Sequence, residues 1–158
     1  MATRPSPEPP VVEFAGQLFF RLWRASHTRA ADTLETVGLT PALFGLLNVI
    51  GARDGAIQQE LGSAMGIDPS TMVSLIDQLE SAGLAKRRPC ARDRRAREVV
   101  ITAKGRRLLE RARRLISEVD DDVLSGLTAS ERSELVTLLR RALDSAPAQP
   151  LWTTDEGD

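Results

Sequence analysis

The chain contains few residues of the types that carry out catalysis or bind metals. Its 158 residues include a single histidine, His27, and a single cysteine, Cys90. One histidine excludes a His-x-x-x-His metal pair, and the sequence also lacks a Gly-x-Ser-x-Gly elbow and a glycine-rich phosphate loop. Asp120, Asp121 and Asp122 are consecutive and would point to different sides of a helix, which favours solvated acids over a metal site. We therefore expect no enzyme, no metal site and no cofactor.

The features of an exported or membrane-spanning protein are also missing. One cysteine cannot form an intramolecular disulfide, and it fits a reducing cytosol. Residues 1–10 contain four prolines and no apolar core of a signal peptide, so we expect a flexible arm there. The longest apolar run, 41–52, is too short to span a bilayer. These features predict a cytoplasmic protein without membrane contact.

Aromatic residues are scarce as well, at 4% of the chain with no tyrosine. The core should therefore consist of Leu, Val, Ile and Ala side chains. A chain of this length is one domain, but it is modest for an elongated helical shape, and a dimer would help to bury it.

The net charge of −1 conceals an uneven distribution of charge. Residues 86–114 hold thirteen of the 21 Lys and Arg side chains and three acids. Acids gather instead near residues 118–122 and in the segment 146–158, which we interpret as an acidic tail. A molecule polarised in this way can attract a polyanion to one face and remain soluble.

Capping signals locate most of the helices. An apolar pattern predicts a helix over about 12–36, and Thr40-Pro41 should start the next one. A very short strand is expected at 56–57. Thr102 can cap a long helix over about 103–125, and the capping box from Thr128 to Glu131 opens a last helix.

The segment 67–102 contains the most informative pattern of the chain. Asp68 is a good N-cap, Pro69 suits the first helical position and Gly83 can end the helix. The spacing of its apolar residues predicts that either Val73, Ile76 and Leu79 or Met72, Leu75 and Leu79 pack on the domain.

The segments on either side of this helix identify its role. A short helix at 58–65 precedes it and ends at Gly66, which permits a tight turn between the two helices. Gly62 inside the short helix suggests a close contact there, since glycine costs about 1 kcal/mol relative to alanine. Residues 86–97 follow with seven basic side chains and one acid, and Pro89 requires an edge strand. The sequence thus predicts a winged helix-turn-helix that binds DNA.

Small polar side chains near the start of a recognition helix allow its backbone to approach base edges and phosphates. A solvated face of an ordinary surface helix would show the same pattern, but the flanking turn and basic wing favour DNA contact. The candidate DNA-binding residues are Ser70, Thr71, Ser74, Gln78, Arg92, Arg94 and Arg95.

The chain resembles the MarR family of transcriptional regulators over about residues 12–145. The resemblance rests on Asp93-Arg94-Arg95 followed by residues 99–105 of sequence Val-Val-Ile-Thr-Ala-Lys-Gly. Ahead of these lie Ser70-Thr71, Leu79-Glu80 and Gly83-Leu84.

The resemblance implies a mainly α fold with a small β-wing. It implies a DNA-binding lobe over about 40–102 and dimerisation helices over about 12–36 and 103–145. A homodimer, most often a repressor, would bind a pseudo-palindromic operator in double-stranded DNA. The helix at 69–82 would enter the major groove, Asp93 would hold the wing, and Arg95 would meet the DNA.

The family's usual switch is a small aromatic or phenolic effector that binds between the dimerisation helices and the DNA-binding lobe. Trp23 and His27, one helical turn apart, could line such a pocket with Phe44 or Asn48. The alternative is that Trp23 belongs to the core and His27 is a surface or hydrogen-bonded residue.

Two other interpretations stay open. In the sequence, Cys90 has Arg88, Arg92 and Arg94 as basic neighbours. Positive charge favours the thiolate form of a cysteine, so Cys90 could serve redox sensing. Peroxide-sensing members of the resembled family carry their cysteine in the first helix, where this chain has none, which favours an incidental cysteine. The other alternative is a winged-helix module that binds a protein partner, which the basic segment disfavours.

Overall fold

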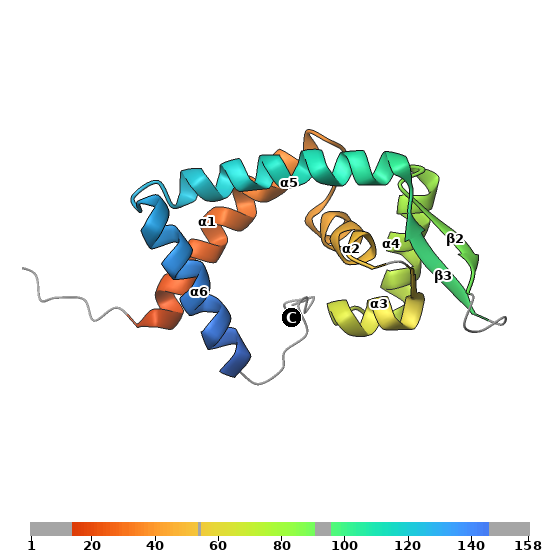
Figure 1. The fold of residues 1–158 in the computed structure, drawn as a ribbon, viewed down its shortest axis with the longest axis horizontal. Coiled ribbons are helices and arrows are strands. Elements are labelled where there is room, and N and C mark those ends of the chain that lie inside the picture. Colours follow the sequence, from red (N-terminus) through yellow and green to blue (C-terminus); the bar gives the residue numbers. More distant parts are fainter. Residues whose placement is uncertain (1–13, 54, 91–95, 146–158) are drawn as a thin grey trace, which may run out of the picture.

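The computed structural model describes residues 14–53, 55–90 and 96–145. These residues form six helices and three short strands (Figure 1). In chain order they are α1 (Ala15–Glu35), α2 (Pro41–Gly51), β1 (Ala56–Ile57), α3 (Gln58–Met65), α4 (Pro69–Ser81), β2 (Ala85–Pro89), β3 (Arg97–Ile101), α5 (Ala103–Val123) and α6 (Ala129–Ser145). The predicted arm at 1–10 and tail at 146–158 lie outside the described residues.

Most helices begin where the sequence predicts. The side chains of Thr40, Asp68 and Thr102 accept hydrogen bonds from backbone N–H groups of the first turns of α2, α4 and α5. At α6, Thr128 Oγ1 accepts from the backbone N–H of Glu131, whose carboxylate accepts in return from the Thr128 backbone. The four predicted N-caps are confirmed.

The strands form one antiparallel sheet in the order β1-β3-β2. Pro89 is the last residue of β2 and pairs with Arg97 of β3. Because β2 is an edge strand, the missing N–H of Pro89 breaks no ladder on its outer side. Gly62 is confirmed as a close contact, since a Cβ there would lie 3.1 Å from the backbone oxygen of Ile67.

The core joins α2, α3 and α4 to the sheet and to the middle of α5. Leucine, isoleucine, valine and methionine provide its largest fully buried side chains, as the scarcity of aromatics predicts: Leu34, Leu46, Leu47, Ile50, Leu61, Met65, Met72, Ile76, Leu79, Val99 and Leu109.

Of the two predicted apolar sets of α4, the set Met72, Leu75 and Leu79 is confirmed, and the alternative set that includes Val73 is wrong. Met72, Leu75, Ile76 and Leu79 are buried, whereas the side chain of Val73 is 38% exposed. At 3.6 residues per turn the four buried residues fill one stripe, and Val73 lies beyond its edge.

The end of α4 is joined directly to the start of α5. The Thr102 hydroxyl donates to the carbonyl of Gly83 at 2.8 Å, and the Thr102 backbone N–H donates to Leu84 O at 3.0 Å. Lys104 Nζ donates to Ala82 O at 2.7 Å. Gly105 approaches so closely that a Cβ there would lie 2.0 Å from Leu84 O. Four contacts thus set the position of α4 on the long helix α5.

Helices α1 and α6 lie at the end of α5 that is far from the sheet (Figure 1). α1 packs along α5 and buries only Leu34, while α6 has no buried residue. Their exposed large apolar side chains are Phe14, Leu18, Phe19, Phe20, Leu22, Trp23, Val136, Leu138 and Leu143. No helix among the described residues has the length and apolar character needed to cross a membrane.

Replacing Gly105 with alanine tests the junction between α4 and α5. We expect Gly105→Ala to lower the free energy of unfolding by about 3 kcal/mol, because a methyl group would collide with the Leu84 backbone. Gly16→Ala is the matched control, since a Cβ at Gly16 meets nothing within 4 Å. Chemical denaturation at equal protein concentration measures both. Equal stability of the two variants would contradict the close contact.

Candidate nucleic-acid interface

The N-terminus of α4 is fixed by the carboxylate of Asp68. This carboxylate accepts hydrogen bonds from the backbone N–H groups of Ser70 at 2.9 Å and Thr71 at 3.0 Å, and also from the Ser70 hydroxyl. These bonds from Ser70 and Thr71 hold the pKa of Asp68 well below its usual range. The positive end of the helix is therefore already occupied by an anion. Its attraction for a DNA phosphate is weaker than the sequence alone suggested.

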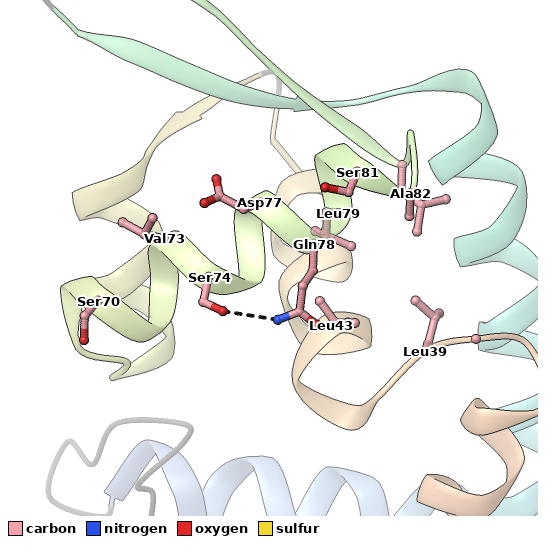
Figure 2. A pocket seen from close by; sticks show the side chains of 12 residues that line it. Leu39, Leu43, Ser70, Val73, Ser74, Asp77, Gln78, Leu79, Ser81 and Ala82 are labelled. Carbon is pink, nitrogen blue, oxygen red and sulfur yellow. Dashed lines mark hydrogen bonds between the residues drawn. The ribbon is translucent and has the colours of Figure 1, made fainter.

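A row of small or uncharged side chains forms the outer face of α4. Figure 2 shows Ser70, Val73, Ser74, Asp77 and Gln78 along a surface hollow of about 760 Å³. Gln78 Nε2 donates to Ser74 Oγ at 3.3 Å. The other wall of the hollow comes from the segment between α1 and α2 and from α2 itself: Gly38, Leu39 and Leu43.

Three of the four predicted DNA-binding residues of this helix therefore share one face. They are Ser70, Ser74 and Gln78. Thr71 is half-buried and does not line the hollow.

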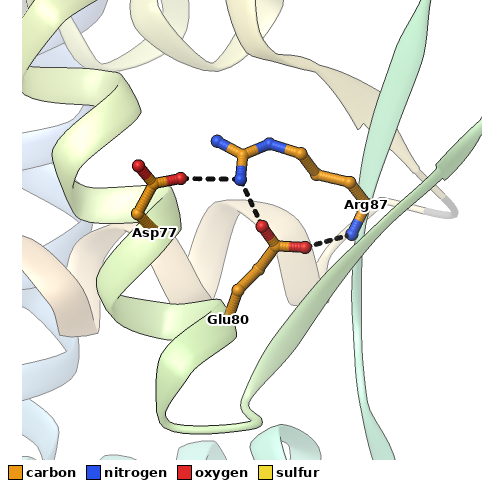
Figure 3. A network of polar contacts seen from close by, with 3 residues as sticks. All are labelled: Asp77, Glu80 and Arg87. Carbon is orange, nitrogen blue, oxygen red and sulfur yellow. Dashed lines mark hydrogen bonds and ion pairs between the residues drawn. The ribbon is translucent and has the colours of Figure 1, made fainter.

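An ion-pair network joins this helix to the first strand of the wing (Figure 3). The Arg87 guanidinium donates to Asp77 at 2.7 Å and also to Glu80, and the Arg87 backbone N–H donates to Glu80 at 2.7 Å. Burial alone would lower the pKa of Arg87, but the hydrogen bonds to Asp77 and Glu80 outweigh burial and raise it. Arg87 thus neutralises two carboxylates of α4 and holds β2 against that helix.

A second ion pair lies inside the sheet. Arg88 Nε donates to Glu98 at 2.6 Å, and the Glu98 side chain is buried. The two residues face each other across β2 and β3. Gly55 leaves room for this carboxylate, because a Cβ at that position would lie 2.5 Å from Glu98 Oε2.

Sequence reasoning missed both networks. The available signals were two acids three positions apart on α4, and a hairpin register that sets Arg88 opposite Glu98. Part of the basic charge near the wing is therefore used inside the protein. The other predicted wing residues, Arg92, Asp93, Arg94 and Arg95, lie outside the described residues, and their DNA contacts stay predictions.

The predicted effector residues fall into two pairs. The rings of Trp23 and His27 stack, with centroids 4.8 Å apart. Asn48 Nδ2 donates to the Phe44 carbonyl at 3.1 Å, and Asn48 Oδ1 accepts from Arg113 Nε at 2.9 Å.

Trp23 lines a second hollow, of about 660 Å³, between α1, α5 and α6. Phe44 and Asn48 are not part of its wall. The structure thus places Trp23 with residues of α5 and α6 rather than with the predicted residues of α2.

The thiol of Cys90 is buried, whereas redox sensing would need a thiol that solvent can reach. Cys90 is 5% exposed, and its backbone N–H donates to Ala96 O at 3.0 Å. Buried cysteines of this kind are usually inert, which favours the incidental interpretation.

Two helices joined by a tight turn and followed by an antiparallel hairpin define the winged helix-turn-helix class of DNA-binding folds. Gly66 makes the turn with a φ of 64°.

Comparison with known proteins agrees with this class. The model of the MarR family matches residues 37–96. A putative transcriptional regulatory protein for the hcr operon of Thauera aromatica is 37% identical over 131 residues, which span 80% of this chain and 79% of that protein. The chain belongs to the MarR family of transcriptional regulators.

Solved structures show the same fold. A cysteine-to-serine mutant of MarR from E. coli superposes with a TM-score of 0.76 at 24% identity, covering 85% of this chain and 99% of that one. The same mutant complexed with operator DNA gives 0.69 at 25% identity, covering 81% and 92%. BpsR of Bordetella bronchiseptica, described with regulation of its DNA binding by 6-hydroxynicotinic acid, gives 0.72 at 25% identity, covering 89% and 99%.

Proposed function

We propose that this regulator is a homodimeric repressor that binds a pseudo-palindromic operator and is released by a small aromatic or phenolic effector. The observation that carries the proposal is the outer face of α4. Ser70, Ser74 and Gln78 lie together there, on a helix braced by the wing through Arg87. Short side chains let a helix backbone approach base edges closely. The E. coli MarR mutant with operator DNA supports this use of the fold.

The wing contributes contacts of a different kind. Residues 86–97 retain basic side chains beyond the two ion pairs, and Arg95 occupies the family position that meets DNA. Phosphate contacts from such a segment add affinity for any sequence, whereas side chains of α4 meet base edges and select one sequence. Two α4 helices of a dimer would reach successive major grooves about 34 Å apart.

Binding measurements on two variants test whether the wing supplies affinity for any DNA and α4 selects the sequence. The operator is first selected from genomic fragments, and it should be a palindrome of roughly 16 to 20 base pairs. We expect Arg95→Ala to weaken binding to all DNA and to flatten the plot of log affinity against log salt by about 0.9 per lost phosphate contact. Ser74→Ala should weaken mainly the selected site. Equal losses of both variants on random DNA would contradict the assignment, and the absence of any enriched sequence would favour a protein-binding module.

The homodimer is supported by the surfaces of α1 and α6. Five of the exposed large apolar side chains lie on α1, one, Phe14, is at its N-cap, and three lie on α6, which buries no residue. An isolated helix of this length is marginal in water without tertiary packing. Contiguous apolar surface on two such helices is typical of a subunit interface. We infer that a second copy of the chain covers it, and that α5 carries each α4 from this interface.

A charge placed on the apolar side of α6 tests the dimer. Leu143 is 71% exposed, so Leu143→Glu should leave the protomer folded and raise the dimer dissociation constant at least tenfold. Thr137→Glu adds the same charge to the polar side of α6 and should have no such effect. Light scattering and sedimentation measure the mass of each variant. A monomeric parent protein, or equal masses of both variants at every concentration, would contradict the proposal.

The effector part of the proposal rests on the hollow beside Trp23. Trp23 and Leu143 of its wall also belong to the apolar surface of the proposed dimer, so the hollow would lie at the subunit interface. Its volume and apolar wall suit a small aromatic compound. Asp120 contributes a carboxyl group to this wall, and burial together with the neighbouring Asp121 raises its pKa, against a hydrogen bond from Ser26. The carboxyl group of Asp120 would repel a ligand carboxylate when it is ionised, so a phenol without a carboxylate fits this wall better than an aromatic acid. Phe44 and Asn48 remain a second, separate candidate pair.

Fluorescence of Trp23 tests the position of the effector. The chain has two tryptophans, and Trp152→Phe leaves Trp23 as the single reporter. Phenolic compounds that release the operator should change the emission of Trp23 with the same concentration dependence. Release of the operator with unchanged Trp23 emission would exclude this hollow.

A further inference from the structure

Val73 is an apolar residue on a helix face that is otherwise polar. The other large apolar side chains of α4 are buried, whereas Val73 points away from the core. In Figure 2 its side chain lies near those of Ser70 and Asp77. Along α4 it is three positions after Ser70 and four before Asp77, so all three lie on neighbouring turns of one face. No hydrogen bond can be made by its side chain, so it needs an apolar partner to contribute to recognition.

The composition of α4 restricts what this helix can recognise. Residues 69–81 contain no lysine or arginine, so the frequent contact of arginine with guanine is absent from this helix. The guanidinium of Arg87, which reaches α4 from β2, is bound to Asp77 and Glu80. Base readout by α4 is therefore limited to hydroxyls, one glutamine, one carboxylate and Val73.

The major groove offers one apolar group for such a side chain. The 5-methyl group of thymine is the only hydrocarbon substituent that base pairs present there. Val73 is β-branched, so its χ1 angle is nearly fixed in a helix, and the methyl groups are already oriented before binding. Its side chain cannot accept or donate a hydrogen bond to a phosphate, which favours contact with a base over contact with the DNA backbone.

We propose that Val73 is a specificity-determining residue that packs against the 5-methyl group of one thymine in each operator half-site. This inference rests on the proposed function, because it requires α4 to enter the major groove. It adds a base preference to that function. We expect the bases that α4 contacts to be rich in A·T pairs, because Val73 would contact thymine and the amide of Gln78 suits adenine.

Replacement of thymine by uracil in the selected operator tests the contact, since the two bases differ only in the 5-methyl group. Each thymine is replaced in turn, and dissociation constants are measured for the parent protein and for Val73→Ala. For the parent, one symmetric pair of replacements should weaken binding about fourfold per half-site, the value of one buried methyl group. For Val73→Ala the same replacements should have no effect, because the partner of the methyl group is gone.

A neighbouring variant controls for general weakening of the interface. Ser74→Ala removes a hydroxyl from the same face and should keep the full penalty of the uracil replacement. Thermal unfolding of Val73→Ala should match the parent, since the Val73 side chain is exposed.

The two ways of failing are distinguishable. Uracil penalties that are the same in the parent and in Val73→Ala at every position would overturn the inference and leave the proposed function intact. A parent protein that selects no DNA sequence would overturn both.

Discussion

The position of the recognition helix depends on the few backbone contacts that join the end of α4 to the start of α5. Three successive carbonyl groups, of residues 82–84, accept hydrogen bonds from Lys104 and Thr102. Gly105 permits this approach, since no side chain would fit between the two segments. The long helix α5 therefore carries α4 as a unit, while its other end carries α1 and α6.

The charges of the wing serve two purposes. At its base, Arg87 and Arg88 are paired with acids of α4 and β3, and these pairs hold the strand, the helix and the sheet together. At Glu80, the backbone N–H of Arg87 donates an additional hydrogen bond to the carboxylate, which offsets part of the cost of removing it from water. Four further residues of the predicted wing, Arg92, Asp93, Arg94 and Arg95, lie outside the described residues, and contact of the three arginines with a polyanion stays a prediction. A count of basic residues in the sequence could not separate these two groups.

Much of the fold was predictable because its signals are local. Thr40, Asp68, Thr102 and Thr128 each satisfy backbone N–H groups within three residues, so a short stretch of sequence contains the whole interaction. Gly66 likewise adopts a positive φ that its own turn requires. The candidate site was predicted in part: Ser70, Ser74 and Gln78 share a face, whereas Thr71 lies to its side. Whether Val73 belongs to the core was left open because two overlapping spacings both satisfied the helical period, and only the direction of the neighbouring elements separated them.

The sequence by itself determined the class of fold and the approximate limits of its helices, because caps, turns and the helical period are properties of adjacent residues. Only the tertiary structure decided which charges are free and which surfaces lack a partner. Arg87 and Glu80 are seven positions apart, and Thr102 and Gly83 nineteen, so their contacts exist only after the chain has folded back on itself. The exposure of Val73, the burial of Cys90 and the uncovered apolar side of α6 follow from how whole elements pack, which no local pattern contains.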